Sequence, residues 1–191
     1  MEEKKGWLDD MGRVSQIDPE TASDEVKEAI RSHLAEGHAL TNEKKTLLHN
    51  VAAFKAVEEA SYDLDDDLQR LIGKLDADLF EYAISVTNEC LVCTTYFSKL
   101  LREQHHIDPN DFHMTRREEL LMKYAQKLAH EPKNITDEEF NELKEDFLLH
   151  GGRDGNPVDE EKAEEIMVVL TAMGAMMIAN NTVNDALRVD V

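Results

Sequence analysis

Apolar residues recur at helical spacing along most of the chain, and the two-residue alternation typical of β-strands is nearly absent. The apolar stripes predict helices near residues 24–36, from about 42, from about 63, over about 89–103, after Thr115, after Thr136 and from about Asp159. The sequence therefore predicts an all-α fold.

Short polar motifs predict where several of these helices begin. Ser23 is placed to cap the first helix, and Thr115 and Thr136 are each followed three residues later by a glutamate, as in a capping box. The acidic run 63–67 would place negative charge at the start of the third helix, which continues through Leu75 and can extend to Val86.

The boundary near Thr87 and Asn88 decides where the most reactive side chains lie. Asn is a favoured N-cap residue, so we expect a break there and a new helix in which Glu89 and Cys90 lie in the first turn and Cys93 just beyond it. The glycine-rich segment 150–157 is expected to be a flexible connection before the final helix.

The most apolar segment, Ile166–Ala179, is too short and too interrupted to cross a membrane, so it predicts a buried helix whose methionines fill the core. The N-terminal residues Met1–Trp7 have no apolar region of the kind that a signal peptide needs. We therefore expect a cytoplasmic protein that does not bind membranes.

The chain has 191 residues, which favours one helical domain over 41–191 preceded by a helical arm over 1–40. Its formal net charge is −20. A surface with so much negative charge would repel nucleic-acid phosphates and anionic lipids, so binding to either is not expected.

The chain has two cysteines, Cys90 and Cys93, and their spacing places them on one helical face. At that spacing the Cα atoms can meet the requirement of a disulfide, about 4.4–6.8 Å. Free N–H groups at a helix start favour the reactive thiolate, whereas Glu89 and the overall negative charge oppose it. The pair therefore predicts a redox-active dithiol whose activation needs a local dipole or base.

Two other interpretations of the cysteines stay open. They can be ordinary buried thiols in an apolar helix. Alternatively, Cys90 and Cys93 with His106 and His113 follow the order of a two-cysteine, two-histidine zinc site. The spacing between the two histidines lies outside the usual range, however, so neither a metal nor a cofactor is expected.

The segment Asp78–Cys93 resembles the core of AhpD-like alkylhydroperoxidases in the carboxymuconolactone decarboxylase superfamily, in which an acidic residue precedes an Ala-Val-Ser-like run, an Asn and a Cys-x-x-Cys motif. Residues 121–128 with 132–138 resemble the next helix and capped connection of that family, and 181–187 resemble its closing helix. The resemblance covers about residues 45–191 and implies an AhpD-like helical bundle that forms trimers or hexamers.

The resemblance also implies roles for individual residues. Cys93 would attack a peroxide and Cys90 would resolve the sulfenic acid as a disulfide, which a partner dithiol protein, often lipoyl-bearing, would reduce. The family's proton relay has a glutamate twelve residues before the first cysteine and a histidine four after the second. Here those positions hold Asp78, which keeps a carboxylate, and Phe97, which cannot transfer a proton.

Other side chains near the motif could replace the missing histidine. Glu81, Tyr96 or a histidine from elsewhere in the chain would serve, although Glu81 is expected to be a solvated helix residue and Tyr96 and Phe97 to be packing residues. If none of them replaces it, peroxide turnover is expected to be slow.

We expect a thiol-dependent oxidoreductase that acts on a hydroperoxide or disulfide substrate. The alternative is a redox-responsive or structural binding module of the same fold with a weakened site. A third hypothesis, decarboxylase-like chemistry on a lactone acid, lacks a cationic cluster that would bind a dicarboxylate.

Overall fold

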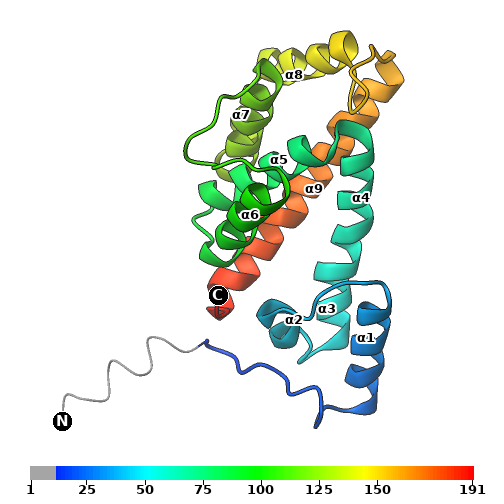
Figure 1. Cartoon of the computed structure of the whole chain (residues 1–191), viewed down its shortest axis with the longest axis vertical. Coiled ribbons are helices and arrows are strands. Elements are labelled where there is room, and N and C mark those ends of the chain that lie inside the picture. Colours follow the sequence, from blue (N-terminus) through cyan, green and yellow to red (C-terminus); the bar gives the residue numbers. More distant parts are fainter. Residues whose placement is uncertain (1–11) are drawn as a thin grey trace, which may run out of the picture. The chain divides into compact units, whose positions relative to one another are not determined.

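The computed structural model describes residues 12–191, which are helical with connecting turns and contain no strand (Figure 1). This confirms the predicted all-α class. The residues on which the signal-peptide prediction rests, Met1–Trp7, lie outside the described part. The elements are α1 (Asp24–Ala35), α2 (Asn42–Leu47), α3 (Val51–Phe54), the π-helical turn η1 (Lys55–Glu59), α4 (Ala60–Ile72), α5 (Lys74–Thr87), α6 (Leu91–Gln104), α7 (Arg116–His130), the 3₁₀ turn η2 (Pro132–Asn134), α8 (Asp137–His150) and α9 (Glu160–Leu187).

The described residues divide into two compact units. Unit 1 contains the described residues up to Ala60 together with Thr182–Val191, and unit 2 contains Ser61–Asn181. Each unit has its own hydrophobic core. The candidate site residues Asp78, Cys90 and Cys93 all belong to unit 2.

Unit 1 packs α1, α2 and α3 around a small core in which Leu48 and Phe54 are fully buried. The Ser23 side chain accepts the Val26 N–H and caps α1, as predicted. The expected continuous helix from Asn42 is instead broken after Leu47, and Asn50 caps the next helical segment. The cap formed by the Asn50 side chain thus interrupts the helix that the apolar pattern predicted.

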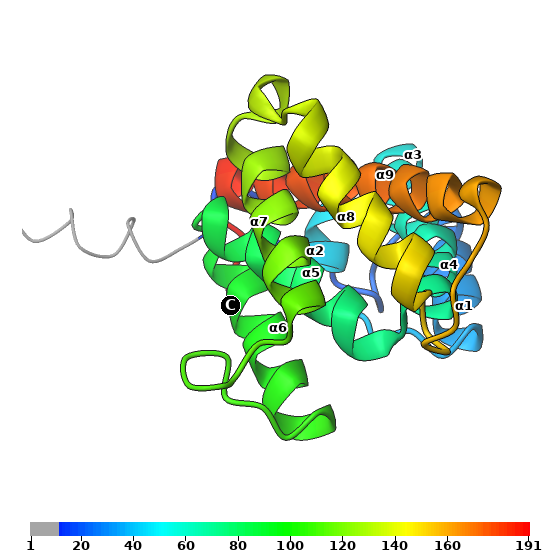
Figure 2. The same cartoon turned by 90° about the horizontal axis from the view of Figure 1, so that it is seen from above.

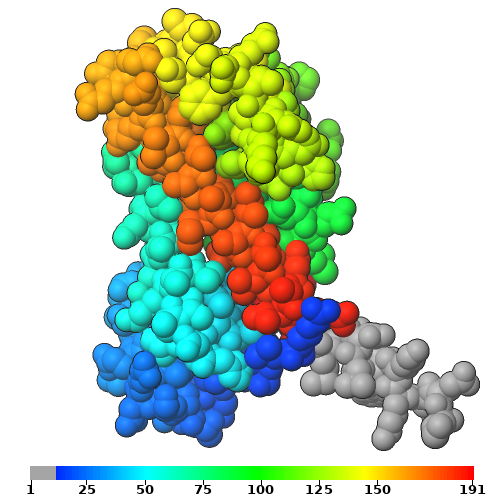
Figure 3. Space-filling view, turned by 180° about the vertical axis from the view of Figure 1, so that it is seen from behind, coloured from blue at the N-terminus to red at the C-terminus, as the bar shows by residue number. Residues whose placement is uncertain are grey.

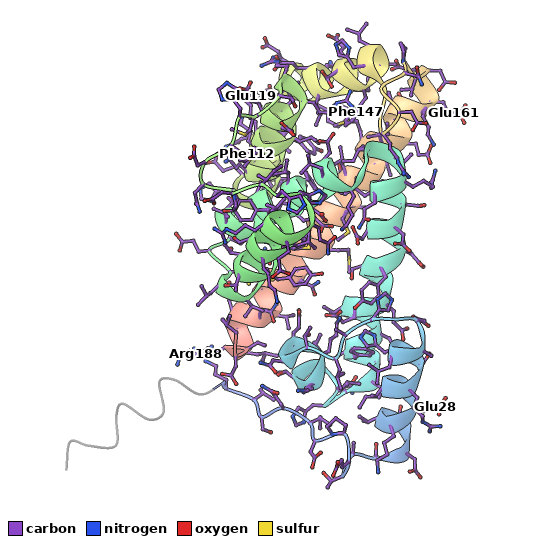
Figure 4. The ribbon with its side chains drawn as sticks, in the orientation of Figure 1. Glu28, Phe112, Glu119, Phe147, Glu161 and Arg188 are labelled. Atoms are coloured by element: carbon purple, nitrogen blue, oxygen red, sulfur yellow. The ribbon has the colours of Figure 1, made fainter. Side chains whose placement is uncertain are left out.

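Unit 2 is organised around α5, which is buried without interruption from Ala77 to Ser85 and packs against α6 and α7 (Figure 2). Both predicted capping boxes are present, at Thr115 on α7 and at Thr136 on α8. The core includes Phe147 of α8, which is fully buried (Figure 4).

The predicted third helix is wrong in its start and its end. Helical backbone already precedes Ala60, so the acidic run 63–67 lies inside α4. The helix ends at Ile72 because Gly73 adopts φ +93°, a left-handed conformation that favours glycine. Lys74 then begins α5 as a separate helix.

The final helix, α9, contributes Ile166, Met167, Leu170, Met173 and Met177 to the core of unit 2, which confirms its predicted role. It is also the one described helix that is long and apolar enough to cross a membrane, and 44% of its most apolar window is buried inside the protein. Part of its length lies on the surface in Figure 3, where it runs from orange to red. Length and composition alone are weak evidence for a membrane span.

The glycine-rich connection between α8 and α9 was expected to be flexible, but backbone contacts hold it. The Arg153 N–H donates to the Leu71 carbonyl over 2.8 Å, and the Arg117 guanidinium donates to the Gly152 carbonyl. A Cβ atom at Gly152 would lie 1.9 Å from the Leu71 oxygen, so only glycine allows this close approach. The connection thereby fastens the start of α9 to the end of α4.

Asp76 in the first turn of α5 faces a partly buried ionic group formed by Arg117, Glu118 and Asp146. Burial, which outweighs the attraction of the Arg117 charge, raises the pKa of Asp76 to about 6. Folding therefore takes up a proton at this site in weakly acidic solution.

Gly152→Ala is expected to lower the free energy of unfolding by about 3 kcal/mol or more, because the new methyl group would collide with backbone that cannot move away. Gly155→Ala is the matched control. Gly155 has φ +67° but no neighbour within 4 Å of an added Cβ, so only backbone strain of about 1 kcal/mol is expected. Urea unfolding of both variants measures the difference, and equal losses would contradict the proposed collision.

Asp76→Asn is expected to stabilise the protein by about 1–2 kcal/mol at about pH 7.5 and to have little effect at about pH 4. Because the pKa in the folded protein is raised, the wild-type stability from this group is complete below its ordinary pKa and is lost as pH rises through about 6. Urea unfolding across this range gives the two profiles. A variant profile parallel to the wild type would show that Asp76 is not the responsible group.

Candidate dithiol site

The two cysteines lie at the turn between α5 and α6. Asn88 is the C-cap of α5 rather than the predicted N-cap of α6, and Glu89 adopts a left-handed conformation with φ +59°. The Cys90 N–H then donates to the Ser85 carbonyl over 3.1 Å, and Cys90 itself becomes the N-cap residue of α6. The predicted break is confirmed, but the helix starts at Leu91, so the cysteines occupy the N-cap and the third helical position.

This placement keeps the sulfur atoms one turn apart at a helix start. In helical geometry residues three apart have Cα atoms about 5 Å from each other, which lies inside the range that a disulfide requires. Both cysteines are present as thiols. The pair can therefore close to a disulfide without moving either helix.

The electrostatics of the helix start favour a thiolate. The first N–H groups of α6 point toward the N-cap, and the first turn of α6 contains no acidic residue. Glu89, expected to oppose ionisation, is exposed, so solvent and salt screen its charge. The helix dipole is thus a source of activation at this position.

The two thiols differ in access. Cys90 is fully buried, whereas Cys93 retains 7% of its surface. Around them Val86, Leu91 and Tyr96 are exposed by 45%, 66% and 57%. A small oxidant approaching this apolar surface would reach Cys93 before Cys90.

Asp78, the predicted relay carboxylate, is buried near the start of α5, far from the turn between α5 and α6, and it contacts other side chains there. Its Oδ2 atom lies 2.6 Å from His105 Nε2 and 3.1 Å from Lys74 Nζ, and the side chain is 2% exposed. Sequence reasoning named no role for His105, because this contact joins residues 27 positions apart in the chain. The only local signal was a histidine at the end of a predicted helix.

The structure does not bring Asp78 to Cys93. Cys93, Phe97, Leu101 and His105 follow one face of α6 at four-residue spacing, so the Cα atoms of Cys93 and His105 are about 18 Å apart. Phe97 and Leu101, both buried, fill the turns between them. Because one water spans only two hydrogen bonds of about 2.9 Å each, a single water does not join the Asp78–His105 pair to the thiol.

Three residues near the motif, Phe97, Tyr96 and Glu81, were predicted to be packing or solvated residues, and the structure agrees with these predictions to different degrees. Phe97 is 7% exposed and packs in the core, as predicted. Tyr96 rests edge-on against Phe97, so it does pack, but it is 57% exposed and lies at the surface and not in the core. Glu81 is 3% exposed rather than solvated, because its position on α5 faces other helices on every side.

A second polar contact, which sequence reasoning also missed, holds the turn. The Asn181 amide on α9 donates to Asn88 Oδ1 over 2.9 Å, and the Asn88 amide donates to the Ala129 carbonyl at the end of α7. Asn181 is 1% exposed. Asn88 thus connects the residues just before the dithiol to two other helices.

The zinc interpretation finds no support in the geometry. Within residues 12–191, no group of three or more His, Cys, Asp or Glu side chains is arranged to hold a metal ion. His106 and His113 lie in the connection after α6, beyond the far end of that helix from the cysteines.

Comparison of the chain with protein-family models and with curated proteins finds no match. The resemblance to AhpD-like proteins therefore stays a prediction.

Phe97→His is expected to accelerate alkylation of Cys93 by about tenfold at neutral pH. An imidazole one turn after Cys93 on the same face can accept the thiol proton and stabilise the thiolate. The rate of iodoacetamide modification, followed in a Cys90→Ser background, measures the effect. Phe97→Leu is the matched control, and an equal rate in both variants would show that a missing base does not limit this thiol.

Proposed function

We propose that this protein is a dithiol oxidoreductase that cycles Cys90 and Cys93 between thiol and disulfide forms while reducing a hydroperoxide or disulfide substrate. The observation that carries the proposal is the placement of the two cysteines at the N-cap and third position of α6. This arrangement combines disulfide reach with the positive end of a helix dipole. No other described group offers a nucleophile in comparable surroundings.

The proposed peroxide reaction proceeds in two balanced steps. The Cys93 thiolate attacks the terminal peroxide oxygen, the O–O bond breaks, and the leaving alkoxide takes a proton to give an alcohol and a Cys93 sulfenic acid. The Cys90 thiolate then attacks the Cys93 sulfur and displaces the sulfenic hydroxyl group, which takes a proton and leaves as water, so the disulfide forms. An external dithiol returns two electrons and two protons and restores both thiols.

Access supports this division of roles. Cys93 is the more exposed thiol, whereas buried Cys90 is placed to react only with its neighbour. The same roles follow from the family resemblance, in which the second cysteine is peroxidatic. Asp78 keeps the family position of the relay carboxylate, but here it would act on Cys93 only through a chain of several groups.

One observation favours a second candidate function. Phe97, which cannot accept a proton, occupies the turn after Cys93 where the resembled family has its histidine, and Asp78 is engaged by His105 and Lys74 instead of the thiol. A redox-responsive module would oxidise reversibly in the same place without consuming peroxide catalytically. It differs from the first candidate only in turnover.

The wider setting of the proposal follows the resemblance. We place the protein among AhpD-like members of the carboxymuconolactone decarboxylase superfamily, as a cytoplasmic homo-oligomer whose reductant is a dithiol protein that can be lipoyl-bearing. The net charge of −20 favours neutral or cationic partners over anionic ones. We propose no cofactor, metal or nucleic-acid partner.

Cysteine variants are expected to separate the two thiols. With an alkyl hydroperoxide and dithiothreitol, Cys93→Ser should lose all peroxide consumption above background. With the hydroperoxide and no reductant, Cys90→Ser should accumulate a sulfenic acid that dimedone traps. Because the chain has two cysteines, mass spectrometry assigns each product without ambiguity. Wild-type protein should lose two hydrogens on oxidation.

Three outcomes distinguish the candidates. Turnover by the wild type that Cys93→Ser abolishes supports the oxidoreductase. A disulfide that forms and reduces without turnover supports the redox-responsive module. Unchanged consumption in Cys93→Ser, or two thiols that neither oxidise nor alkylate at neutral pH, contradicts both.

A further inference from the structure

Three carboxyl groups meet inside unit 2, away from the dithiol. Asp78 and Glu81 lie on the same face of α5, and Asp65 reaches them from α4. Glu81 is 3% and Asp78 2% exposed. Such a cluster is costly inside a protein unless cations or protons compensate its charge.

The nearby lysine and histidine make direct contacts with only one of the three carboxyl groups. Lys74 Nζ lies 3.3 and 3.1 Å from the two Asp78 oxygens, and His105 Nε2 from α6 lies 2.6 Å from Asp78 Oδ2. Asp65 instead accepts the neutral amide of Gln69 on both oxygens, at 2.9 and 2.8 Å. Asp65 and Glu81 are therefore left without a direct cation.

The Asp65 carboxyl group is near enough to Glu81 that hydrogen bonding between the two side chains contributes to the raised pKa of Glu81. Two carboxylates cannot form this bond without a proton between them, because both are acceptors only when ionised. The Oε1 atom of Glu81 is buried with no hydrogen-bond partner among the described residues, as expected for the carbonyl oxygen of a neutral carboxyl group. The burial of Glu81, its unpartnered Oε1 atom and the nearby Asp65 carboxyl group together call for one shared proton.

We propose that a single proton shared by Glu81 and Asp65 clamps α4 to α5, and that its removal in alkaline solution loosens α4, so that unit 2 contains a pH-sensitive switch. With the proton in place, Lys74 balances one remaining carboxylate charge. Without it, three carboxylates face one ammonium group and the imidazole of His105. The switch is separate from the dithiol and does not depend on the proposed oxidoreductase function.

The direction of the pH dependence follows from the cause. Burial, and after it the charges of Asp65 and Asp78, raise the pKa of Glu81 well above its ordinary value, with Lys74 acting in the opposite direction. Burial also raises the pKa of Asp65. Stability from the shared proton is therefore complete below the ordinary pKa of a glutamate and is lost as pH rises through the raised value.

Two measurements test the switch. In wild-type protein at neutral pH, infrared spectroscopy should detect the carbonyl stretch of a protonated carboxyl group, and Glu81→Gln should remove that band. Over about pH 5–9, the stability of the wild type should fall with rising pH relative to Glu81→Gln, by up to tenfold in the folding equilibrium constant per pH unit. Backbone hydrogen exchange should speed up first in α4.

Asp66→Asn is the matched control, because Asp66 is an exposed carboxylate next to Asp65 on the same helix. It should retain both the infrared band and the wild-type pH profile, whereas Asp65→Asn should alter both. The infrared measurement on wild-type protein stands even if a variant fails to fold. Absence of a protonated carboxyl at neutral pH, or equal pH profiles for wild type and Glu81→Gln, would overturn the proposal.

Discussion

The hydrogen bond from the Cys90 N–H to the Ser85 carbonyl closes the short turn on which the arrangement of α5 and α6 depends. It makes the two helices antiparallel, which the contact between Asp78 near the start of α5 and His105 at the end of α6 requires. Helices α5 and α6 thus form a hairpin whose two ends carry different groups. The two thiols lie at the turn, and the ionisable side chains lie at the opposite end, where α5 begins and α6 ends. The buried apolar residues Phe97 and Leu101 lie between the thiols and the ionisable side chains.

This separation explains how acidic and redox-capable groups coexist in a chain with so much negative charge. A thiolate next to three carboxyl groups would be strongly disfavoured, since like charges in a poorly hydrated interior repel one another. About three turns of α6 separate the cysteines from His105, which contacts Asp78, so the carboxyl groups are far enough away that the helix dipole acts on the cysteines more strongly than they do. The same distance keeps the Asp78 carboxylate from acting directly as a base for the thiols.

Local signals predicted the fold well where a residue and its partner are neighbours in sequence. The capping boxes at Thr115 and Thr136 and the cap at Ser23 are present because each motif satisfies backbone groups within one turn. Asn88 was assigned to the wrong helix, since asparagine is common at both ends of helices and the choice depended on Glu89 accepting a left-handed backbone. Gly73 ended a helix that apolar periodicity alone would have continued.

For the site, the sequence predicted the dithiol and its position at a helix start but not the groups around it. The Asp78–His105 contact and the burial of Glu81 depend on how three helices pack, which periodicity on one helix does not specify. A carboxylate in a helix is usually solvated, so the residue type of Glu81 did not indicate that it is buried. Its spacing from Asp78 and Ser85, which share a face of α5, was the one available hint.

The contact between Asn88 and Asn181 has a consequence for biogenesis. The two residues are 93 positions apart, so a nascent chain emerging from the ribosome contains the cysteine turn long before it contains the amide that steadies it. Contacts of such sequence separation form late, because the entropy of closing a long loop must first be overcome. The turn that carries the thiols thus reaches its final geometry only when α9 packs against it, and before that step the thiols are part of an incompletely folded chain.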